Sequence, residues 1–377
     1  MQKIKVTCGI DNIELVHGEL AESRLGLVTA PSGVDRTLRP SWDILRERYH
    51  LTVLMAPEHG LRGAAQAGGH DDNHVDPESG LPVYSLGSGE EYVSPEALEQ
   101  LDVLLFDIQD VGARFYTYLY TMTRCMKACA AAGKPFYVLD RMNPIGLRQL
   151  EGNILDEQYA SFVGEYAVPT RYGLTIGEFA RYINVSHRLG CDLHVVPCGN
   201  LTRELYFEDT DLQFIPPSPN IPTPQTALTY VGTCIFEATN VSEGRGTTRP
   251  FELIGAPFID GRLLLERMNA HRFEGVLFRR AYFTPTFSKH QGVLCDGIQI
   301  HVTDRNLYRP FAVGLYLFQE IRSLFPEFAM LNSGAHLFGD LKLRDAYTSC
   351  DRIAAFLVEN ERRLADFRRE SESSWLY

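Results

Sequence analysis

Residues 103–139 read VLLFDIQDVGARFYTYLYTMTRCMKACAAAGKPFYVL, an apolar run, a helical pattern and a second apolar run in succession. The runs at 103–106 and 135–139 are continuous and rich in large apolar residues, as expected for strands buried on both faces of a parallel sheet. The helical pattern at 116–132 ends at Gly133, where a helix often stops. This order predicts a parallel strand–helix–strand unit.

Three further apolar runs, at 25–29, 51–55 and 193–196, extend the alternation in both directions. Helical patterns cover residues 40–49 and 175–189. The second begins with Thr175 as N-cap and Glu178 three residues later, and Gly190 follows its end. We therefore predict an α/β fold with a Rossmann-like, doubly wound, mostly parallel sheet.

Residues 214–224 contain five prolines, so a helix cannot pass through them and an extended connector is expected. Beyond it, a strand-like run at 292–303 and helical patterns at 311–324 and 351–369 indicate a smaller α+β domain. The prediction is a Rossmann-like catalytic domain over residues 1–215. An auxiliary α+β domain over residues 216–377 would close the active-site cleft.

Composition excludes several classes of partner. A net charge of −12 over 377 residues argues against binding to nucleic acid or to an anionic membrane surface. No stretch of about 18 apolar residues occurs, and residues 1–8 are too short and polar for a signal peptide. The eight cysteines are scattered without a CxxC pair, which favours reduced, buried thiols. We expect a cytoplasmic protein, or a periplasmic or secreted one if a leader has been removed. The oligomeric state stays open.

Three predicted strands run directly into polar loops, at residues 56–63, 107–118 and 140–146. Because ligands bind outside the carboxyl ends of strands in open parallel sheets, these loops predict a polar ligand site. No GxGxxG or GxxxxGK[ST] phosphate cradle and no GxSxG serine elbow occurs in the sequence. No cofactor is expected. Asp140 and Arg141 are expected to form an ion pair at a strand end.

Carboxyl groups at such a rim suit glycoside hydrolysis, which in most families uses a protonated acid and a second carboxylate. Glu58 follows an apolar run directly and is the predicted acid. His59 either orients Glu58 or is a buried structural histidine. The candidates for the second carboxyl group are Glu243 and Asp110, followed by Asp107 and Glu252.

The predicted second domain contributes the loop 239–252, in which two glycines, two arginines and two glutamates crowd together. It is either a solvated turn with internal ion pairs or a loop that closes over the ligand, since clefts favour domain interfaces. Arginine side chains in these loops can bind a carboxylate with two hydrogen bonds. The rings of Tyr116 and Tyr118 can face a sugar or belong to the core.

The run 69–76 offers a rival interpretation, because His70 and His74 together with His59 suggest a metal site. Its candidate ligands fall at adjacent positions of one loop, without a spacing fixed by a helix. A solvated acidic loop is therefore preferred, and no metal is expected.

Several of these motifs resemble those of the NamZ-type exo-β-N-acetylmuramidases, a family formerly described as a domain of unknown function. The resemblance spans nearly the whole chain. Its segments are PEHGLRG at 57–63, FDIQDVGARFYTY at 106–118, LDR at 139–141, NPIG at 143–146, PSPN at 217–220, residues 242–250, HVTDR at 301–305 and WLY at 375–377.

The resemblance implies a Rossmann-like domain, an auxiliary domain and an active site between them. It implies removal of terminal N-acetylmuramic acid from the non-reducing end of peptidoglycan fragments. This sugar carries a lactyl carboxylate, which the arginines of the loops would bind. Glu58 matches the family's catalytic glutamate. The predicted substrate-binding residues are His59, Arg62, Asp107, Gln109, Arg114, Tyr116, Asn220, Arg245 and Arg249. A metal-dependent hydrolase and a non-catalytic muropeptide-binding module stay as alternatives.

Overall fold

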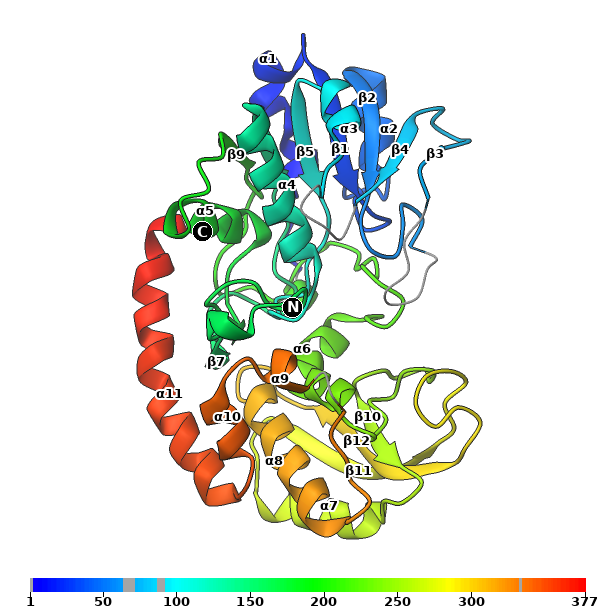
Figure 1. Cartoon of the computed structure of the whole chain (residues 1–377), viewed down its shortest axis with the longest axis vertical. Coiled ribbons are helices and arrows are strands. Elements are labelled where there is room, and N and C mark those ends of the chain that lie inside the picture. The colour runs from blue at the N-terminus through cyan, green and yellow to red at the C-terminus, as the bar shows by residue number, and fades with distance from the viewer. Residues whose placement is uncertain (1–2, 64–71, 87–91, 332–333) are drawn as a thin grey trace.

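The structure is a computed structural model that describes residues 3–63, 72–86, 92–331 and 334–377. Its N-terminal half forms the upper part of Figure 1, and residues after about 224 form most of the lower part. The long helix α11 (Cys350–Ser371) runs along one side from the lower part back to the upper part.

The upper part is built on a seven-stranded sheet in the order β3-β4-β2-β1-β5-β6-β9. Its strands are β1 (Arg24–Thr29), β2 (His50–Ala56), β3 (His74–Val75), β4 (Pro82–Ser85), β5 (Val103–Asp107), β6 (Phe136–Leu139) and β9 (Leu193–Val196). Every neighbouring pair is parallel except β3 with β4. The predicted mostly parallel sheet and its five predicted strands are confirmed.

Side chains of the sheet divide between two apolar clusters, one on each face. Along β5, Leu104 and Phe106 belong to one cluster, while Val103 and Leu105 belong to the other. This alternation is why the central strands read as continuous apolar runs. The helices and 3-10 turns of this half are η1 (Gly9–Val16), α1 (His17–Leu20), α2 (Ser41–Arg48), α3 (Pro95–Glu99), α4 (Tyr118–Ala132), η2 (Glu157–Tyr159), α5 (Ile176–Ser186) and η3 (Phe207–Asp209).

Helix α5 begins as predicted. The backbone N–H of Glu178 donates to Thr175 Oγ1, and the backbone N–H of Thr175 donates to Glu178 Oε2, each over 3.1 Å. This reciprocal pair is a capping box. The helix ends at Ser186, earlier than the predicted residue 189, and Gly190 follows in a left-handed conformation with φ 68°.

The lower part carries an antiparallel sheet in the order β10-β12-β11, with β10 (Leu253–Ala256), β12 (Cys295–Val302) and β11 (Val276–Phe283). A third sheet pairs β7 (Glu151–Ile154) with β8 (Pro169–Arg171). The remaining helices are α6 (Pro224–Thr233), η4 (Cys234–Ala238), α7 (Gly261–Ala270), α8 (Pro310–Leu324), α9 (Gly334–Phe338), α10 (Leu341–Ala346) and η5 (Glu372–Ser374). The predicted boundary at residues 215 and 216 stays a prediction.

Helices α6 and α8 cross at Gly232 and Gly314. A Cβ atom on either glycine would run into the backbone of the facing helix, so only glycine permits this approach. Helix α6 leads directly into η4. The close crossing therefore fixes the position of η4, which contributes to the site below.

The segment after α11 anchors this helix to the edge of the first sheet where β6 ends. The Tyr377 hydroxyl donates to Asp140 Oδ2 over 2.7 Å, and the Arg203 guanidinium lies 3.9 Å from the centre of the Trp375 ring. Along α11, Asn360 Nδ2 donates to the carbonyl oxygen of Gly152 over 2.7 Å. These contacts tie the C-terminal segment to residues of the N-terminal half.

All eight cysteines are free thiols and seven of them are buried, as their scattered spacing predicts. Within the described ranges, none of the helices combines the length and apolar character needed to cross a bilayer. The compartment in which the protein works stays a prediction.

Candidate active site

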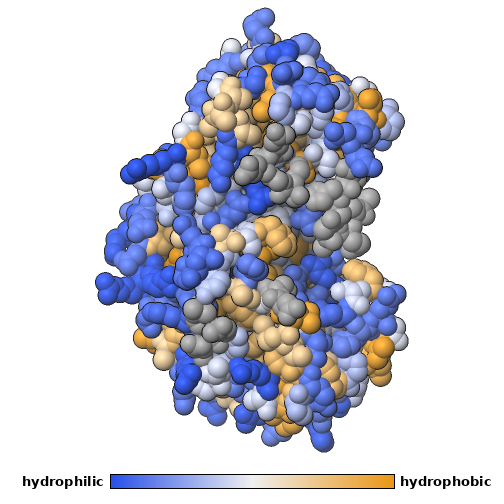
Figure 2. Space-filling view, in the orientation of Figure 1, coloured by the Kyte–Doolittle hydropathy of each residue, from blue (hydrophilic) through white to orange (hydrophobic). Residues whose placement is uncertain are grey.

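A cavity of about 410 Å³ is lined by segments from both halves of the chain. Figure 2 shows apolar surface gathered at the waist between the upper and lower parts, within a mostly hydrophilic exterior. The volume lies in the range of small-molecule sites. Its lining residues are Glu58, His59, Phe115, Tyr116, Thr117, Phe162, Val163, Ser218, Asn220, Ile221, Tyr230, Glu237, Arg245, Phe251, His336 and Leu337.

Glu58 is carried on a tight turn directly after β2. The backbone N–H of Gly60 donates to the carbonyl oxygen of Pro57 over 3.0 Å, which closes the turn. His59, its third residue, has a left-handed conformation with φ 75°, which is uncommon for a residue other than glycine. Such strain clusters at functional sites, and here it aims Glu58 at the cavity.

Thr117 and Tyr118, at the start of α4, hold Glu58 in place. Thr117 Oγ1 donates to Glu58 Oε2 over 2.8 Å. The hydroxyl of Tyr118 lies 3.3 Å from the carbonyl oxygen of Glu58 and 3.1 Å from that of Pro217. Tyr118 thereby connects the turn that carries Glu58 to the proline-rich connector. The Glu58 side chain is 18% exposed, so its carboxyl group stays accessible.

His59 is buried beside Glu58, with its Nε2 4.0 Å from Glu58 Oε1. Its ring meets the Tyr118 ring edge to face, with centroids 6.5 Å apart. Both the orienting and the packing interpretations are compatible with this position.

Aromatic rings form an apolar wall of the cavity. Tyr230 on α6 packs edge to face against Phe115, Tyr116 and Phe251, with centroids 6.1, 6.4 and 4.7 Å apart. Phe251 is a second lining residue in a left-handed conformation, with φ 61°. The predicted contribution of Tyr116 to this site therefore has a structural basis.

The loop that follows η4 brings Arg245 to the cavity. Gly244 and Gly246 flank it with φ 81° and 80°, and a Cβ at either position would lie within 3.0 Å of backbone atoms. The guanidinium of Arg245 bridges two carboxylates: Nη2 lies 2.6 Å from Glu237 Oε1, and Nε lies 3.4 Å from Glu243 Oε1. Arg245 and Asn220 are thus predicted binding residues that line the cavity.

Glu243, the leading candidate for the second carboxyl group, is not among the lining residues. Its side chain is 2% exposed, and Lys289 Nζ lies 2.6 Å from its Oε2. Lys289 also donates to the carbonyl oxygens of Phe236, Thr239 and Val241 over 2.6, 3.0 and 2.7 Å. Glu243 therefore balances the charge of the half-buried Lys289 and does not face the cavity.

Glu237 is a lining carboxyl group that sequence reasoning missed. It lies in the short apolar turn η4, where no motif marks it. Burial raises the pKa of Glu237 above its ordinary value, Arg245 opposes the increase, and the charge of Glu243 adds to it. Partial burial and a raised pKa are typical of functional carboxyl groups.

Most of the predicted site residues that follow β5 bind other protein groups in the interior and do not face the cavity. The Asp107 carboxylate forms a two-point ion pair with Arg141, with Nε–Oδ1 2.6 Å and Nη2–Oδ2 2.9 Å. The expected pair of Asp140 with Arg141 is therefore wrong, because the guanidinium turns to Asp107. Gln109 Nε2 donates to the carbonyl oxygens of Asp110 and Met142 over 2.7 and 2.9 Å.

Asp110 is 4% exposed and is not among the lining residues. Its Oδ2 accepts hydrogen bonds from the Tyr172 hydroxyl and from the backbone N–H of Gly112. Burial raises the pKa of Asp110 to about 6, against the effect of these hydrogen bonds. Within the described ranges, Oδ1 has no hydrogen-bond partner.

Three predicted arginines also lie outside the lining set. Arg114 is fully buried and donates to the carbonyl oxygens of Asn153 and Val168 over 2.6 and 3.1 Å, and burial lowers its pKa to about 10. Arg62 pairs with Asp76 and Glu78 at 2.6 and 2.9 Å.

Arg249 pairs with Glu252 at 3.5 Å and is 51% exposed. Glu252 is itself buried, and it accepts hydrogen bonds from Thr226 Oγ1 and Gln225 Nε2 over 2.7 and 3.1 Å. These groups already have partners within the protein.

The rival metal site cannot be assembled from described residues, because His70 lies outside them. His74 is exposed, with Nδ1 2.8 Å from the carbonyl oxygen of Asp72. Elsewhere in the described chain, one group of three metal-type side chains comes together: His271, Glu320 and Cys350, with ligand atoms within 4.8 Å. None of the three lines the cavity.

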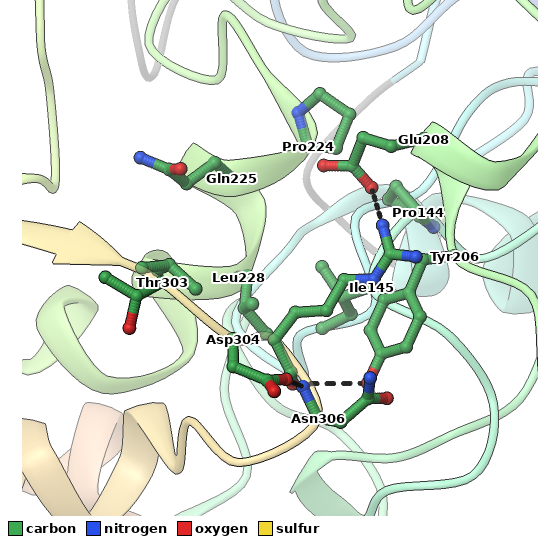
Figure 3. A pocket seen from close by; sticks show the side chains of 12 residues that line it. Pro144, Ile145, Tyr206, Glu208, Pro224, Gln225, Leu228, Thr303, Asp304 and Asn306 are labelled. Carbon is green, nitrogen blue, oxygen red and sulfur yellow. Dashed lines mark hydrogen bonds and ion pairs between the residues drawn. The ribbon is translucent and has the colours of Figure 1, made fainter. Parts of the chain in front are cut away.

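A second cavity of about 330 Å³ lies between the β12 end and the Pro144 loop (Figure 3). Its charged groups are joined to one another. Arg305 pairs with Glu208 at 3.4 Å and also with Asp209, and it lies 4.4 Å from the Tyr206 ring centre. Glu58 does not line this cavity, so the 410 Å³ cavity is the better candidate.

Comparison with known proteins covers both halves of the chain. The family model described as exo-beta-N-acetylmuramidase NamZ, N-terminal, matches residues 25–225, and the corresponding C-terminal model matches residues 228–377. The peptidoglycan beta-N-acetylmuramidase NamZ of Bacillus subtilis (strain 168) is 45% identical over 382 residues, which cover 100% of this chain and 92% of that protein.

Two crystal structures of DUF1343 family proteins from Bacteroides fragilis share the fold. One aligns with a TM-score of 0.90 and 34% identity over 100% of both chains. The other aligns with a TM-score of 0.79 and 28% identity over 99% of both chains.

Proposed function

Because the chain belongs to the NamZ family of exo-β-N-acetylmuramidases, we propose that its reaction takes place in the cavity beside Glu58. The protein is a glycoside hydrolase that releases N-acetylmuramic acid from the non-reducing end of peptidoglycan fragments. This reaction requires a group that gives a proton to the glycosidic oxygen as the bond to the sugar breaks.

The observation that carries the assignment is the way in which Glu58 is held. Its carboxyl group is accessible from the cavity, while Thr117 fixes Oε2 and Tyr118 fixes the backbone. A rigid, partly buried carboxyl group is suited to general acid catalysis, because proton transfer depends on geometry before acidity. Glu58 protonates the leaving oxygen, and the alcohol departs with that proton.

The rest of the cavity suits a single terminal sugar. The rings of Tyr116, Tyr230 and Phe251 supply an apolar surface that excludes water from the breaking bond. The Asn220 amide makes no hydrogen bond to any residue in the described ranges and is 6% exposed. It is therefore the group that we assign to the polar substituents of the sugar, the acetamido or the lactyl group.

The test compares two leaving groups in Glu58→Gln. The substrates are 4-nitrophenyl β-N-acetylmuramide and a disaccharide with N-acetylmuramic acid at its non-reducing end. Loss of the acid should lower kcat/KM for the disaccharide by roughly 100- to 10,000-fold. The loss should be smaller for the nitrophenyl glycoside, because nitrophenolate leaves without protonation.

Glu78→Gln is the matched control, because Glu78 pairs with Arg62 on the surface and is 72% exposed. It should keep the activity of the unmodified protein on both substrates. Equal losses for the two leaving groups in Glu58→Gln would contradict the acid role. Near-normal turnover of the disaccharide would remove Glu58 from the reaction altogether.

A further inference from the structure

Glu237 and Glu243 share one guanidinium but have different surroundings. Glu237 is 28% exposed and lines the cavity, whereas Glu243 is 2% exposed and lies behind the cavity wall. Only Glu237 can therefore reach a substrate or a water molecule in the cavity without rearrangement of the protein.

Arg245 holds Glu237 by one oxygen atom. Its Nε and Nη2 atoms both donate to Oε1, over 3.2 and 2.6 Å. No hydrogen bond or ion pair from the described ranges reaches Oε2. The carboxylate is thus fixed at Oε1 and open at Oε2. A general base needs this arrangement, because one oxygen must be free to accept a proton from a bound water.

Opposing effects act on the pKa of Glu237, and their net result is an increase. Arg245 stabilises the ionised form, while burial and the charge of Glu243 raise the pKa of Glu237. A carboxylate of higher proton affinity is a stronger general base near neutral pH. Lys289 supports this arrangement from behind, since it donates to the carbonyl oxygen of Phe236, the residue before Glu237.

We propose that Glu237 is the second catalytic carboxyl group, the base that activates the hydrolytic water opposite Glu58. The inference rests on the proposed active site and completes it. The oxygen of the water forms a bond with the anomeric carbon while the bond to the leaving oxygen breaks. Glu237 Oε2 takes one proton of the water, and Glu58 gives its proton to the leaving oxygen.

This single displacement consumes one water and needs no other reactant. After the products leave, Glu237 releases a proton to solvent and Glu58 takes one up, so both groups return to their starting states. Attack from the face opposite the leaving group converts a β-glycoside into α-N-acetylmuramic acid. The anomeric outcome is therefore the most direct consequence of the proposal.

The first experiment follows the product by proton NMR during the first turnovers of the unmodified protein. The α-anomer should form before mutarotation. Initial formation of the β-anomer would overturn the proposal, because retention requires a covalent intermediate or help from the substrate's acetamido group.

The second experiment measures Glu237→Gln and Glu237→Ala. Each should lower kcat by roughly 100- to 10,000-fold on both substrates, since water activation is needed whatever group leaves. Azide should restore turnover of the nitrophenyl substrate in Glu237→Ala by giving the α-glycosyl azide, because azide attacks without a base. A merely structural role of Glu237 would give no azide rescue, and that result would overturn the proposal.

Glu252→Gln is the matched control, because Glu252 is a buried glutamate at the end of the loop that carries Arg245, and it does not line the cavity. It should keep kcat within about threefold, even if its melting temperature falls. If Glu237→Gln turns over normally while Glu58→Gln is inactive, Glu237 is not the base and the proposed active site stands. If both variants are active, the proposed active site falls as well.

The pH profile supplies an independent readout. Activity should fall as the pH drops through the pKa of Glu237, because only the ionised form accepts a proton. The acidic limb should vanish in azide-rescued Glu237→Ala and persist in Glu252→Gln. If the acidic limb persisted in azide-rescued Glu237→Ala, the assignment of Glu237 as the base would be overturned. The other ionisable groups that interact with Glu237 are Arg245, Glu243, Lys289, Cys234 and Tyr230.

Discussion

Two regions of this molecule have similar polar composition and opposite uses. The loops after β5 and β6 bury Asp107, Arg114 and Arg141, each at most 5% exposed, and their charged groups bind one another or backbone carbonyls. Around the cavity, Glu58 and Glu237 are 18% and 28% exposed. We call the first region the collar, defined as residues 107–114 and 140–141.

The difference lies in how completely each polar group is satisfied. A fully bonded and buried ion pair fixes the ends of strands, but it has nothing left to offer a ligand. The Glu237 carboxyl group is held at Oε1 and has no partner from the described ranges at Oε2, so it can take part in proton transfer. Polar residues at the carboxyl ends of parallel strands therefore divide into scaffold and site, and only their burial and partners separate them.

The largest loss of stability in the collar is expected from a substitution at Arg141. Arg141→Leu leaves Asp107 buried without its partner, which should lower the free energy of unfolding by about 3–5 kcal/mol. Denaturant unfolding measures the loss. The double variant Asp107→Leu with Arg141→Leu should recover much of it, because no unpaired charge remains. A folded double variant with kcat reduced a hundredfold would instead place the collar in the site.

Asp110 tests the same distinction through pH. Its pKa is raised to about 6 from 3.8, so its contribution to stability is present below pH 4 and is lost as the pH rises through 6. Asp110→Asn removes this loss, on the order of 3 kcal/mol, and Asn can still accept the bonds from Tyr172 and Gly112.

Unfolding of both proteins at several pH values between 4 and 7 measures the effect. The variant should be at least as stable as the unmodified protein at pH 7, with most of its activity kept. Asp140, whose pKa burial also raises to about 6, is unchanged in both proteins, so their difference isolates Asp110. Parallel stability curves, or an inactive variant, would contradict the assignment of Asp110 to the scaffold.

The smallest effect is expected at Arg249. Arg249→Ala should change the free energy of unfolding by less than about 1 kcal/mol, because the pair with Glu252 is exposed on one side. Its kcat/KM should stay within about twofold. The same substitution at Arg245, which lines the cavity, should lower kcat/KM by roughly tenfold or more because Glu237 loses its two hydrogen bonds. Equal losses of kcat/KM at Arg245 and Arg249 would contradict the distinction between a cavity-lining arginine and a surface one.

Much of the fold follows from the sequence because its signals are local. The central strands β1, β2, β5 and β6 are apolar on both faces, and α5 carries its capping box in four residues. Strands β3 and β4 were not predicted, since β3 is two exposed residues long. Strand β11 was also missed, because arginines at 279 and 280 interrupt its apolar pattern.

The site was only partly predictable. Glu58 lies in a dense polar motif directly after a strand, and this position made it predictable from the sequence. Glu237 is one acid in the apolar turn CIFEA, and it gains meaning only when Arg245 and the cavity are placed beside it. Arg114 is the opposite case: its motif marks it as a candidate, but its guanidinium donates to buried backbone carbonyl oxygens and does not line the cavity. Long-range partners decide these cases, and sequence spacing does not encode them.

The anchoring of Tyr377 to Asp140 also has a consequence for biosynthesis. The two residues are 237 positions apart, so translation at about 5–20 residues per second separates their appearance by roughly 10–50 s. During that interval the nascent N-terminal half lacks the hydroxyl that caps a buried carboxyl group. We expect this half to stay protease-sensitive on the ribosome until Tyr377 emerges, even though its own strands are complete much earlier.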